Sequence, residues 1–217
     1  MMKRFEHIDV WLFDLDNTLY SHTSGFMDIF VEQLRRVAAN HLGVSIEEMQ
    51  RVRETLISRY GVPFKGYRQD YNMDMDKYIE EAFDLDLSLL EPCPKTREII
   101  QKIPGKKVIF SNSPALHVHR VLKHLGLDDL FEEVFDVTQV DFEVKPGQIF
   151  YDYVLEKLQV PAEKCAMVED SAKNLEPARA MGMTTILVNH TEEKQHPHVQ
   201  YQYDTLLDWL DDLSLKK

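Results

Sequence analysis

The chain has 217 residues, of which 44% are hydrophobic and 29% charged, and its formal net charge is −12. This composition is ordinary for a globular protein, and the length suffices for one large core with a smaller second domain. An acidic surface without a Lys/Arg-rich run argues against a nucleic-acid polymer as partner. The apolar run near the N-terminus is too short for a signal peptide or a membrane span, and the two cysteines show no redox or metal spacing. We therefore expect a cytoplasmic protein that makes no membrane contact.

The first predicted element is a strand. An apolar run from Ile8 to Phe13 leads directly into Asp14 and Asp16. Runs of this kind are typical of strands buried on both faces of a parallel sheet. Side chains two apart in a strand point the same way, so both carboxylates are expected at its carboxyl end, where open α/β sheets bind ligands. Two like charges this close favour a bound cation, and oxygen ligands indicate Mg²⁺. The alternative is a plain Asp/Asn-rich turn.

The segment 21–91 is predicted to be all-helical. Its apolar residues recur at spacings of three and four, which is the helical period. Gly43 is suited to end a first helix, and Ser45 is suited to cap a second. Prolines at positions 92 and 94 mark the end of the segment. The predicted helices span residues 24–42, 45–60 and 74–83, and the Gly- and Pro-containing residues 61–68 are predicted to form a loop.

The second half of the chain alternates predicted helices and strands. The helices are expected at residues 95–102, 114–125, 146–158, 175–181 and 203–213. The strands are expected at residues 106–110, 134–137, 165–168 and 184–188. Such alternation predicts an α/β fold with a parallel sheet covered by helices on both faces.

Polar residues follow one of these strands and begin the helix after it. Ser111 and Asn112 come directly after residues 106–110, and Ser113-Pro114 suits the cap and first position of a helix. Backbone amides at a helix start favour a phosphate, and the Ser111 hydroxyl could donate to one. An ordinary capped helix is an equally good interpretation of this stretch alone.

Two further sites carry charge. Lys145 lies at a predicted helix start, where a cation opposes the helix dipole unless it holds an anion or offsets carboxylates; the alternative is a surface lysine. Glu169 and Asp170 end another apolar strand, so Asp170 is a candidate metal ligand with Glu169 beside it. Asn174 could cap the next helix, with Pro177 in its first turn.

Taken in order, four of these features resemble the four motifs of the haloacid dehalogenase-like hydrolase superfamily, and the resemblance covers nearly the whole chain. They are Asp14-x-Asp16-x-Thr18, Ser111, Lys145-Pro146 and Glu169-Asp170. The helical segment lies between the first two motifs, as in members with a helical cap. The resemblance implies a Rossmann-like parallel-sheet core formed by residues 1–20 and 92–217, with residues 21–91 as an inserted all-helical cap domain.

Shorter stretches resemble the pyrimidine 5′-nucleotidase-like branch of this superfamily. They are Tyr60-Gly61, Gly66-Tyr67, Phe110-Ser111-Asn112 and the run from Glu169 to Ala178. Many members of the branch have Thr where Ser111 stands, and either hydroxyl could bind phosphate. The implied substrate is a small phosphorylated metabolite, namely a nucleoside 5′-monophosphate with a pyrimidine base preferred.

The resemblance also implies a mechanism, which is that of a Mg²⁺-dependent phosphatase with an aspartyl-phosphate intermediate. Asp14 would attack phosphorus, and Asp16 would protonate the leaving alcohol and then deprotonate water. Mg²⁺ would be held by the Asp14 carboxylate, the Asp16 backbone carbonyl and the Asp170 carboxylate. The remaining phosphoryl contacts would come from Ser111, the Asn112 amide and Lys145.

Three alternatives to a nucleotidase stay open. A phosphatase of phosphoglycolate or sugar phosphates and a phosphomutase would use the same four motifs. A non-catalytic scaffold that binds a phospholigand is disfavoured because Asp14 and Asp16 are both present. Dehalogenases of the superfamily generally lack the second aspartate, so Asp16 favours phosphate chemistry.

Substrate selection is expected in the cap. Lys65, Tyr67 and Arg68 lie in its predicted central loop, where an aromatic ring could stack on a base and a cation could reach a phosphate. The alternative is a tyrosine that packs inside the cap beside solvated cations. Of the histidines, His117 and His119 are two apart on a predicted helix and share no face, and the tract at His196 and His198 fits a surface loop better than a weak metal site.

Overall fold

The computed structural model describes residues 4–190 and 194–215. Its centre is a six-stranded, fully parallel sheet in the order β3-β2-β1-β4-β5-β6. The strands are β1 (Val10–Phe13), β2 (Lys106–Phe110), β3 (Glu133–Phe135), β4 (Cys165–Glu169), β5 (Thr184–Leu187) and β6 (Tyr201–Gln202). The predicted α/β class with a Rossmann-like parallel sheet is confirmed, and β6 is an edge strand that the sequence pattern did not predict.

Strand β1 lies in the middle of the sheet. All four of its residues are buried, as an unbroken apolar run between two neighbouring strands requires. Trp11 and Phe13 pack on one face against Trp209, with ring centroids 5.8 and 5.9 Å apart. Because β1 pairs with β2 on one side and β4 on the other, the residues that follow these three strands meet at one edge of the sheet.

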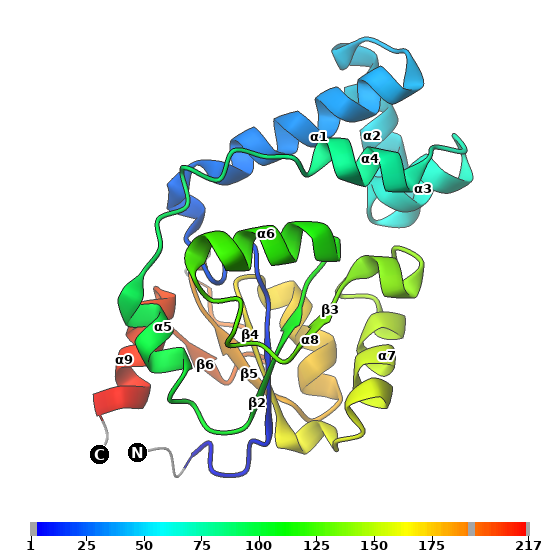
Figure 1. Cartoon of the computed structure of the whole chain (residues 1–217). Helices are drawn as coiled ribbons and strands as arrows, with labels where there is room; N and C mark the ends of the chain where they lie inside the picture. The colour runs from blue at the N-terminus through cyan, green and yellow to red at the C-terminus, as the bar shows by residue number, and fades with distance from the viewer. Residues whose placement is uncertain (1–3, 191–193, 216–217) are drawn as a thin grey trace.

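Helices cover both faces of the sheet (Figure 1). On one face, α5 (Pro94–Ile100) packs on α9 (Leu206–Leu215), which carries Trp209. On the other, α7 (Gln148–Leu158) packs on α8 (Ala172–Ala180), which contacts β4 and β5. Helix α6 (Ala115–Leu125) connects β2 and β3. Within the described residues, no helix combines the length and the apolar character needed to cross a membrane.

Four helices between β1 and β2 form a separate layer, which we call the cap. They are α1 (Phe26–Leu42), α2 (Ile46–Tyr60), α3 (Pro63–Gln69) and α4 (Met75–Ala82). Gly43 ends α1 in the left-handed conformation, and the Ser45 side chain accepts from the Glu48 N–H at the start of α2, both as predicted. The cap stands over the carboxyl ends of the strands (Figure 1).

Helix α3 corrects the prediction of a loop at residues 61–68. Pro63 occupies its first turn, where a missing N–H costs nothing. Gly66 lies inside the helix. Any other residue at this position would place its Cβ 2.3 Å from the Leu56 side chain. The glycine therefore permits close packing of α3 on α2 and does not mark a turn.

Candidate active site

Lys145 connects the carboxyl ends of three strands. Its ammonium donates to Asp14 Oδ1 at 2.7 Å, to Glu169 Oε2 at 2.8 Å and to the Phe110 carbonyl at 2.7 Å. Lys145 is only 3% exposed, so the alternative of a surface lysine is wrong. Asp14 is also buried, and its backbone N–H donates to the Val168 carbonyl of the adjacent strand. A buried cation thus sits between two buried carboxylates at the carboxyl edge of the sheet.

The buried charges shift one another's ionisation. Burial and the neighbouring Glu169 raise the pKa of Asp14 to about 7, although Lys145 acts in the opposite direction. Burial, Glu169 and Asp14 raise the pKa of Asp170 to about 10. Burial lowers the pKa of Lys145, but the attraction of Asp14 and Glu169 outweighs it, so that pKa is raised and the amine stays charged. The single lysine does not fully neutralise the three acids.

The three acids form a cluster that fits a divalent cation. Asp14, Glu169 and Asp170 each offer a carboxylate oxygen, and these oxygens lie within 4.8 Å of one another. Carboxylate oxygens are the ligands that Mg²⁺ prefers, and a divalent ion would relieve the repulsion that raises the pKa values of Asp14 and Asp170. Glu169 Oε2 already accepts from Lys145, and Glu169 Oε1 accepts from the N–H groups of Asp170 and Ser171. Asp14 and Asp170 are therefore the better candidate ligands.

Asp16 points to a different set of partners. Its Oδ1 accepts from the Tyr20 hydroxyl at 2.7 Å and from His117 Nε2 at 2.8 Å, and its Oδ2 accepts from the Ser113 hydroxyl at 2.5 Å. Burial acts to raise the pKa of Asp16, but the contacts with His117, Ser113 and Tyr20 outweigh it, and the pKa is lowered. Asp16 is therefore held as a carboxylate by partners that lie outside the acidic cluster.

Two residues of this network were not predicted in their roles. Ser113 was predicted to cap α6, but Pro114 is the N-cap and the Ser113 side chain bonds Asp16 instead. The spacing of His117 and His119 disfavours a metal pair, and it does not predict the contact of His117 with Asp16. The only sequence signal is a polar residue on the apolar face of α6, which also carries the buried Val118 and Val121.

Ser111 and Asn112 directly follow β2, and Asn112 holds the backbone of the lysine. Ser111 is buried, and its hydroxyl oxygen accepts from the Ser113 N–H at 3.0 Å. The Asn112 side chain accepts from the Lys145 N–H at 2.8 Å and donates to the Lys145 carbonyl at 3.2 Å. Because that side chain is engaged with Lys145, the backbone N–H of Asn112 is the amide that could meet a phosphate oxygen.

The loop after β4 begins α8 differently from the prediction. Ser171 is the N-cap, while Asn174 and Pro177 lie inside the helix. Glu169 Oε1 accepts from the N–H groups of Asp170 and Ser171 at 3.2 and 3.1 Å. The helix begins directly after these two residues, at Ala172. The predicted cap at Asn174 and first-turn position of Pro177 are therefore wrong by several residues.

The three predicted cap residues have contacts with partners other than the acids and the lysine of this site. Tyr67 is 1% exposed and packs on Tyr78 inside the cap, with ring centroids 5.5 Å apart, which contradicts a ring free to stack on a base. Lys65 pairs with Glu143, and Arg68 pairs with Asp141. Both acids belong to the loop before Lys145, so these cations connect the cap to the sheet domain.

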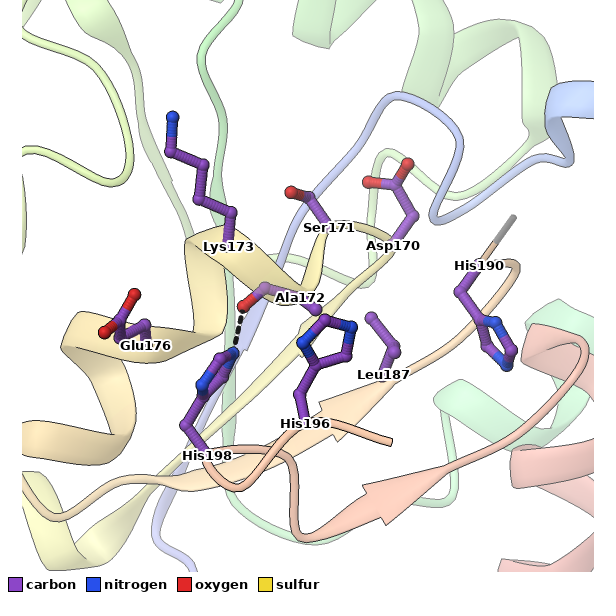
Figure 2. A pocket seen from close by; sticks show the side chains of 9 residues that line it. All are labelled: Asp170, Ser171, Ala172, Lys173, Glu176, Leu187, His190, His196 and His198. Atoms are coloured by element: carbon purple, nitrogen blue, oxygen red, sulfur yellow. Dashed lines mark hydrogen bonds between the residues drawn. The ribbon is translucent and has the colours of Figure 1, made fainter. Parts of the chain in front are cut away.

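A pocket of about 420 Å³ lies beside Asp170, and its lining residues belong to the sheet domain. Figure 2 shows His190, His196 and His198 around it, with His198 Nε2 bonded to the Ala172 carbonyl at 2.8 Å. The rings of His196 and His198 are 5.4 Å apart. Among the described residues, the acidic cluster is the one group with metal-binding geometry, and it includes neither of these histidines.

The parallel sheet, the helical cap and the carboxylate–lysine centre at the strand ends define an α/β protein of the kind that binds and transforms a small anionic ligand at its sheet edge. A family model described as haloacid dehalogenase-like hydrolase matches residues 8–182. The chain belongs to this family, as its four motifs implied. The pyrimidine 5′-nucleotidase-like branch stays a prediction.

Individual relatives are similar to this chain at low identity. "Phosphate metabolism protein 8" of Saccharomyces cerevisiae is 27% identical over 90% of this chain, which spans 64% of the yeast protein's length. "Glyceraldehyde 3-phosphate phosphatase" of Methanocaldococcus jannaschii is 25% identical over 90% of this chain and 91% of its own length. The crystal structure of a HAD phosphatase from Thermococcus onnurineus matches with a TM-score of 0.67 and 22% identity, covering 95% and 98% of the two chains. That structural match supports the fold.

Proposed function

We propose that the protein is a Mg²⁺-dependent phosphomonoester hydrolase that works through an aspartyl-phosphate. The observation that carries this proposal is Asp14, a buried carboxylate held by Lys145 at 2.7 Å within an acidic cluster that fits a divalent cation. Asp14 lies at the carboxyl edge of the sheet, where ligands of α/β proteins bind. The family membership and the phosphatase names of relatives support the same chemistry.

The first half of the reaction forms an acyl phosphate. An Asp14 oxygen attacks phosphorus, the bond from phosphorus to the leaving oxygen breaks, and that oxygen takes a proton from Asp16. The structure holds Asp16 as a carboxylate, but the negative charge of an incoming phosphate raises the pKa of a nearby acid and favours protonation. In the second half, water attacks phosphorus, its proton goes to Asp16, and the bond from phosphorus to Asp14 breaks.

The other residues stabilise charge on the transferred group. Lys145, the Ser111 hydroxyl and the Asn112 backbone N–H are the donors nearest to where its oxygens would lie, and fixed donors of this kind supply much of the catalysis in phosphoryl transfer. The Asp14 and Asp170 carboxylates and the Asp16 carbonyl would hold Mg²⁺, which offsets phosphate charge when bound. Glu169 keeps Lys145 in place.

The substrate is proposed to be a small phosphorylated metabolite that the cap encloses. A nucleoside 5′-monophosphate, with pyrimidines preferred, is the candidate that the motif resemblance favours. A sugar phosphate or phosphoglycolate is the second candidate, favoured by the name of the archaeal relative and by Tyr67, whose ring is packed inside the cap. Both cysteines are free, which agrees with a reducing compartment such as the cytoplasm.

Phosphate release from a substrate panel tests the proposal. The panel contains UMP, CMP, dTMP, AMP, GMP, phosphoglycolate and several sugar phosphates, each with Mg²⁺ and with EDTA. We expect metal-dependent release, and the best substrate decides between the two candidates. A phosphomutase would instead return the phosphoryl group and depend on a sugar-bisphosphate primer. Asp14→Asn should abolish turnover, since an amide is not a nucleophile here; wild-type rates in that variant, free of host enzyme, would disprove the mechanism.

A further inference from the structure

The two oxygens of Asp16 have unequal surroundings. Oδ1 accepts two hydrogen bonds, from Tyr20 and from His117, while Oδ2 accepts one within the described residues, from Ser113. A carboxylate oxygen has about two acceptor positions, so Oδ1 is saturated and Oδ2 retains one. Oδ2 is therefore the oxygen that can exchange a proton with a substrate or with water.

His117 is the donor that reaches Asp16 from a different part of the fold. Its Nε2 lies 2.8 Å from Oδ1, and a carboxylate oxygen can only accept, so Nε2 carries the hydrogen. The residue is 1% exposed and lies on α6 of the sheet domain, 101 positions from Asp16. An imidazole that is buried and bonded in this way has one fixed orientation.

Aromatic rings of the cap hold that imidazole. The His117 ring stacks on Phe30 of α1 at 4.8 Å between centroids and 13° between planes, and Phe83 at the end of α4 lies at 5.4 Å. Phe26, one turn before Phe30, lies parallel to the imidazole at 6.2 Å and also contacts Tyr20, the other Oδ1 donor, at 5.7 Å. Both donors to Oδ1 are thus packed against the cap helix α1.

We propose that His117 is a positioning residue for Asp16: it anchors Oδ1, with its own ring fixed by the cap phenylalanines, so that Oδ2 faces the leaving oxygen. The inference rests on the proposed function and deepens it by naming the residue that orients the acid/base group. It predicts that loss of the Nε2 donor leaves phosphoryl transfer to Asp14 intact where no proton is needed. Steps that need a proton from or to Asp16 should slow.

Leaving groups of different basicity separate these steps. p-Nitrophenolate departs without protonation, whereas an alkyl alcohol must be protonated as its bond to phosphorus breaks. His117→Phe keeps an aromatic ring for stacking and removes the donor, and His117→Gln restores an N–H near the Nε2 position. His119→Phe is the matched control, because His119 is exposed on the same helix. His117→Leu is the second donor-free variant should Phe disturb folding.

The experiment measures the pre-steady-state burst of p-nitrophenol, the steady-state rate, and kcat/KM for an alkyl phosphate, all with Mg²⁺. For His117→Phe we expect a burst rate within about threefold of wild type, and a loss of about 10- to 100-fold in steady-state turnover and in alkyl kcat/KM. His117→Gln should recover most of the loss, and His119→Phe should match wild type. A crystal structure of His117→Phe should show the Asp16 carboxylate rotated.

Two outcomes would overturn the inference. An equal loss on aryl and alkyl phosphates, burst included, would assign His117 a purely structural role. If both donor-free variants kept the wild-type burst rate, steady-state rate and alkyl kcat/KM, Asp16 would need no anchor at Oδ1. Failure of the proposed function looks different, because wild-type protein would then give no burst and no phosphate at all.

Discussion

The ammonium of Lys145 lies 2.7 Å from Asp14 Oδ1, although 131 positions separate the two residues in the chain. Neither side chain has much contact with water, and Glu169 Oε2 completes the group at 2.8 Å from the same ammonium. The lysine thus has two roles: it holds the proposed nucleophile in place, and it reduces the repulsion between two buried carboxylates.

Replacement of this lysine should therefore cost both activity and stability. We expect Lys145→Met to reduce phosphate release by more than about 100-fold, because a charged donor to the transferring group is lost. Removing one partner of a buried ion pair costs about 3 to 5 kcal/mol, so the metal-free variant should unfold at distinctly lower urea. Lys164→Met is the control, since Lys164 is 45% exposed and its ion pair with Asp9 is at the surface. Equal urea midpoints for Lys145→Met and wild type would contradict this account.

The raised pKa values predict how the stability of the metal-free protein depends on pH. In the unfolded chain, Asp14 and Asp170 ionise around their ordinary pKa of 3.8, but in the folded protein the pKa values are about 7 and about 10. For each carboxyl, between its unfolded and its folded pKa, the folded state binds more protons than the unfolded state. The contribution of both carboxyls to the free energy of unfolding therefore falls as pH rises. In EDTA, the free energy of unfolding should be lower at about pH 9 than at about pH 5.

Asp170→Asn isolates the part of this effect that belongs to one carboxyl. The variant cannot ionise at this position, so in EDTA its stability relative to wild type should increase from about pH 5 to about pH 9. Mg²⁺ should remove that advantage, because the ion stabilises wild type through the intact cluster. Urea titrations of the variant and wild type at both pH values, with EDTA and with Mg²⁺, measure the difference in the free energy of unfolding under each of the four conditions. A relative stability that is independent of pH in EDTA would show that Asp170 ionises normally in the folded protein.

The sequence predicted the parts of the fold that depend on local pattern. The buried run at residues 8–13 and the alternation after residue 92 became strands and helices of a parallel sheet, because burial on both faces and helical periodicity leave clear signals. The two-residue strand β6 has no apolar run and owes its conformation to pairing with β5. Helix α3 was hidden because Pro63 and Gly66 are typical of loops, and only the contact with Leu56 explains the glycine.

In the site too, the residues that a local pattern marks were predicted, and those that depend on tertiary contacts were not. Asp14, Glu169 and Asp170 lie at the ends of strands that meet at one edge of the sheet. The structure brings Lys145, from a predicted helix start, together with them. The contact of His117 with Asp16 depends on side chains 101 positions apart and on a helix whose rotation the sequence does not specify. Such long-range pairs leave no periodic signal.

The Lys65–Glu143 ion pair offers a test of the cap residues. If it connects the cap to the sheet domain, Lys65→Ala and Glu143→Ala should each change KM slightly and alike, and the double variant should be no worse than either. We expect a coupling of about 0.2 to 1 kcal/mol between the two sites, as for partly exposed pairs. Arg59→Ala is the control, because Arg59 and its partner Asp70 both belong to the cap and their ion pair does not reach the sheet domain. A large rise in KM for Lys65→Ala alone would restore the prediction that this lysine binds substrate.

Tyr67 separates packing from substrate binding in the same way. Its ring is buried against Tyr78, with Phe64 at 6.4 Å, and burial raises the pKa of its hydroxyl to about 12. Tyr67→Phe keeps the ring and should leave KM within about twofold of wild type, while Tyr67→Ala should lower the free energy of unfolding by about 3 to 5 kcal/mol through the cavity it creates. Tyr71→Ala is the control, because Tyr71 is exposed and its loss leaves no cavity. Urea unfolding and KM for the best substrate of the panel measure both effects. A stable Tyr67→Ala variant with a strongly raised KM would mean that the ring leaves the cap interior to meet the substrate.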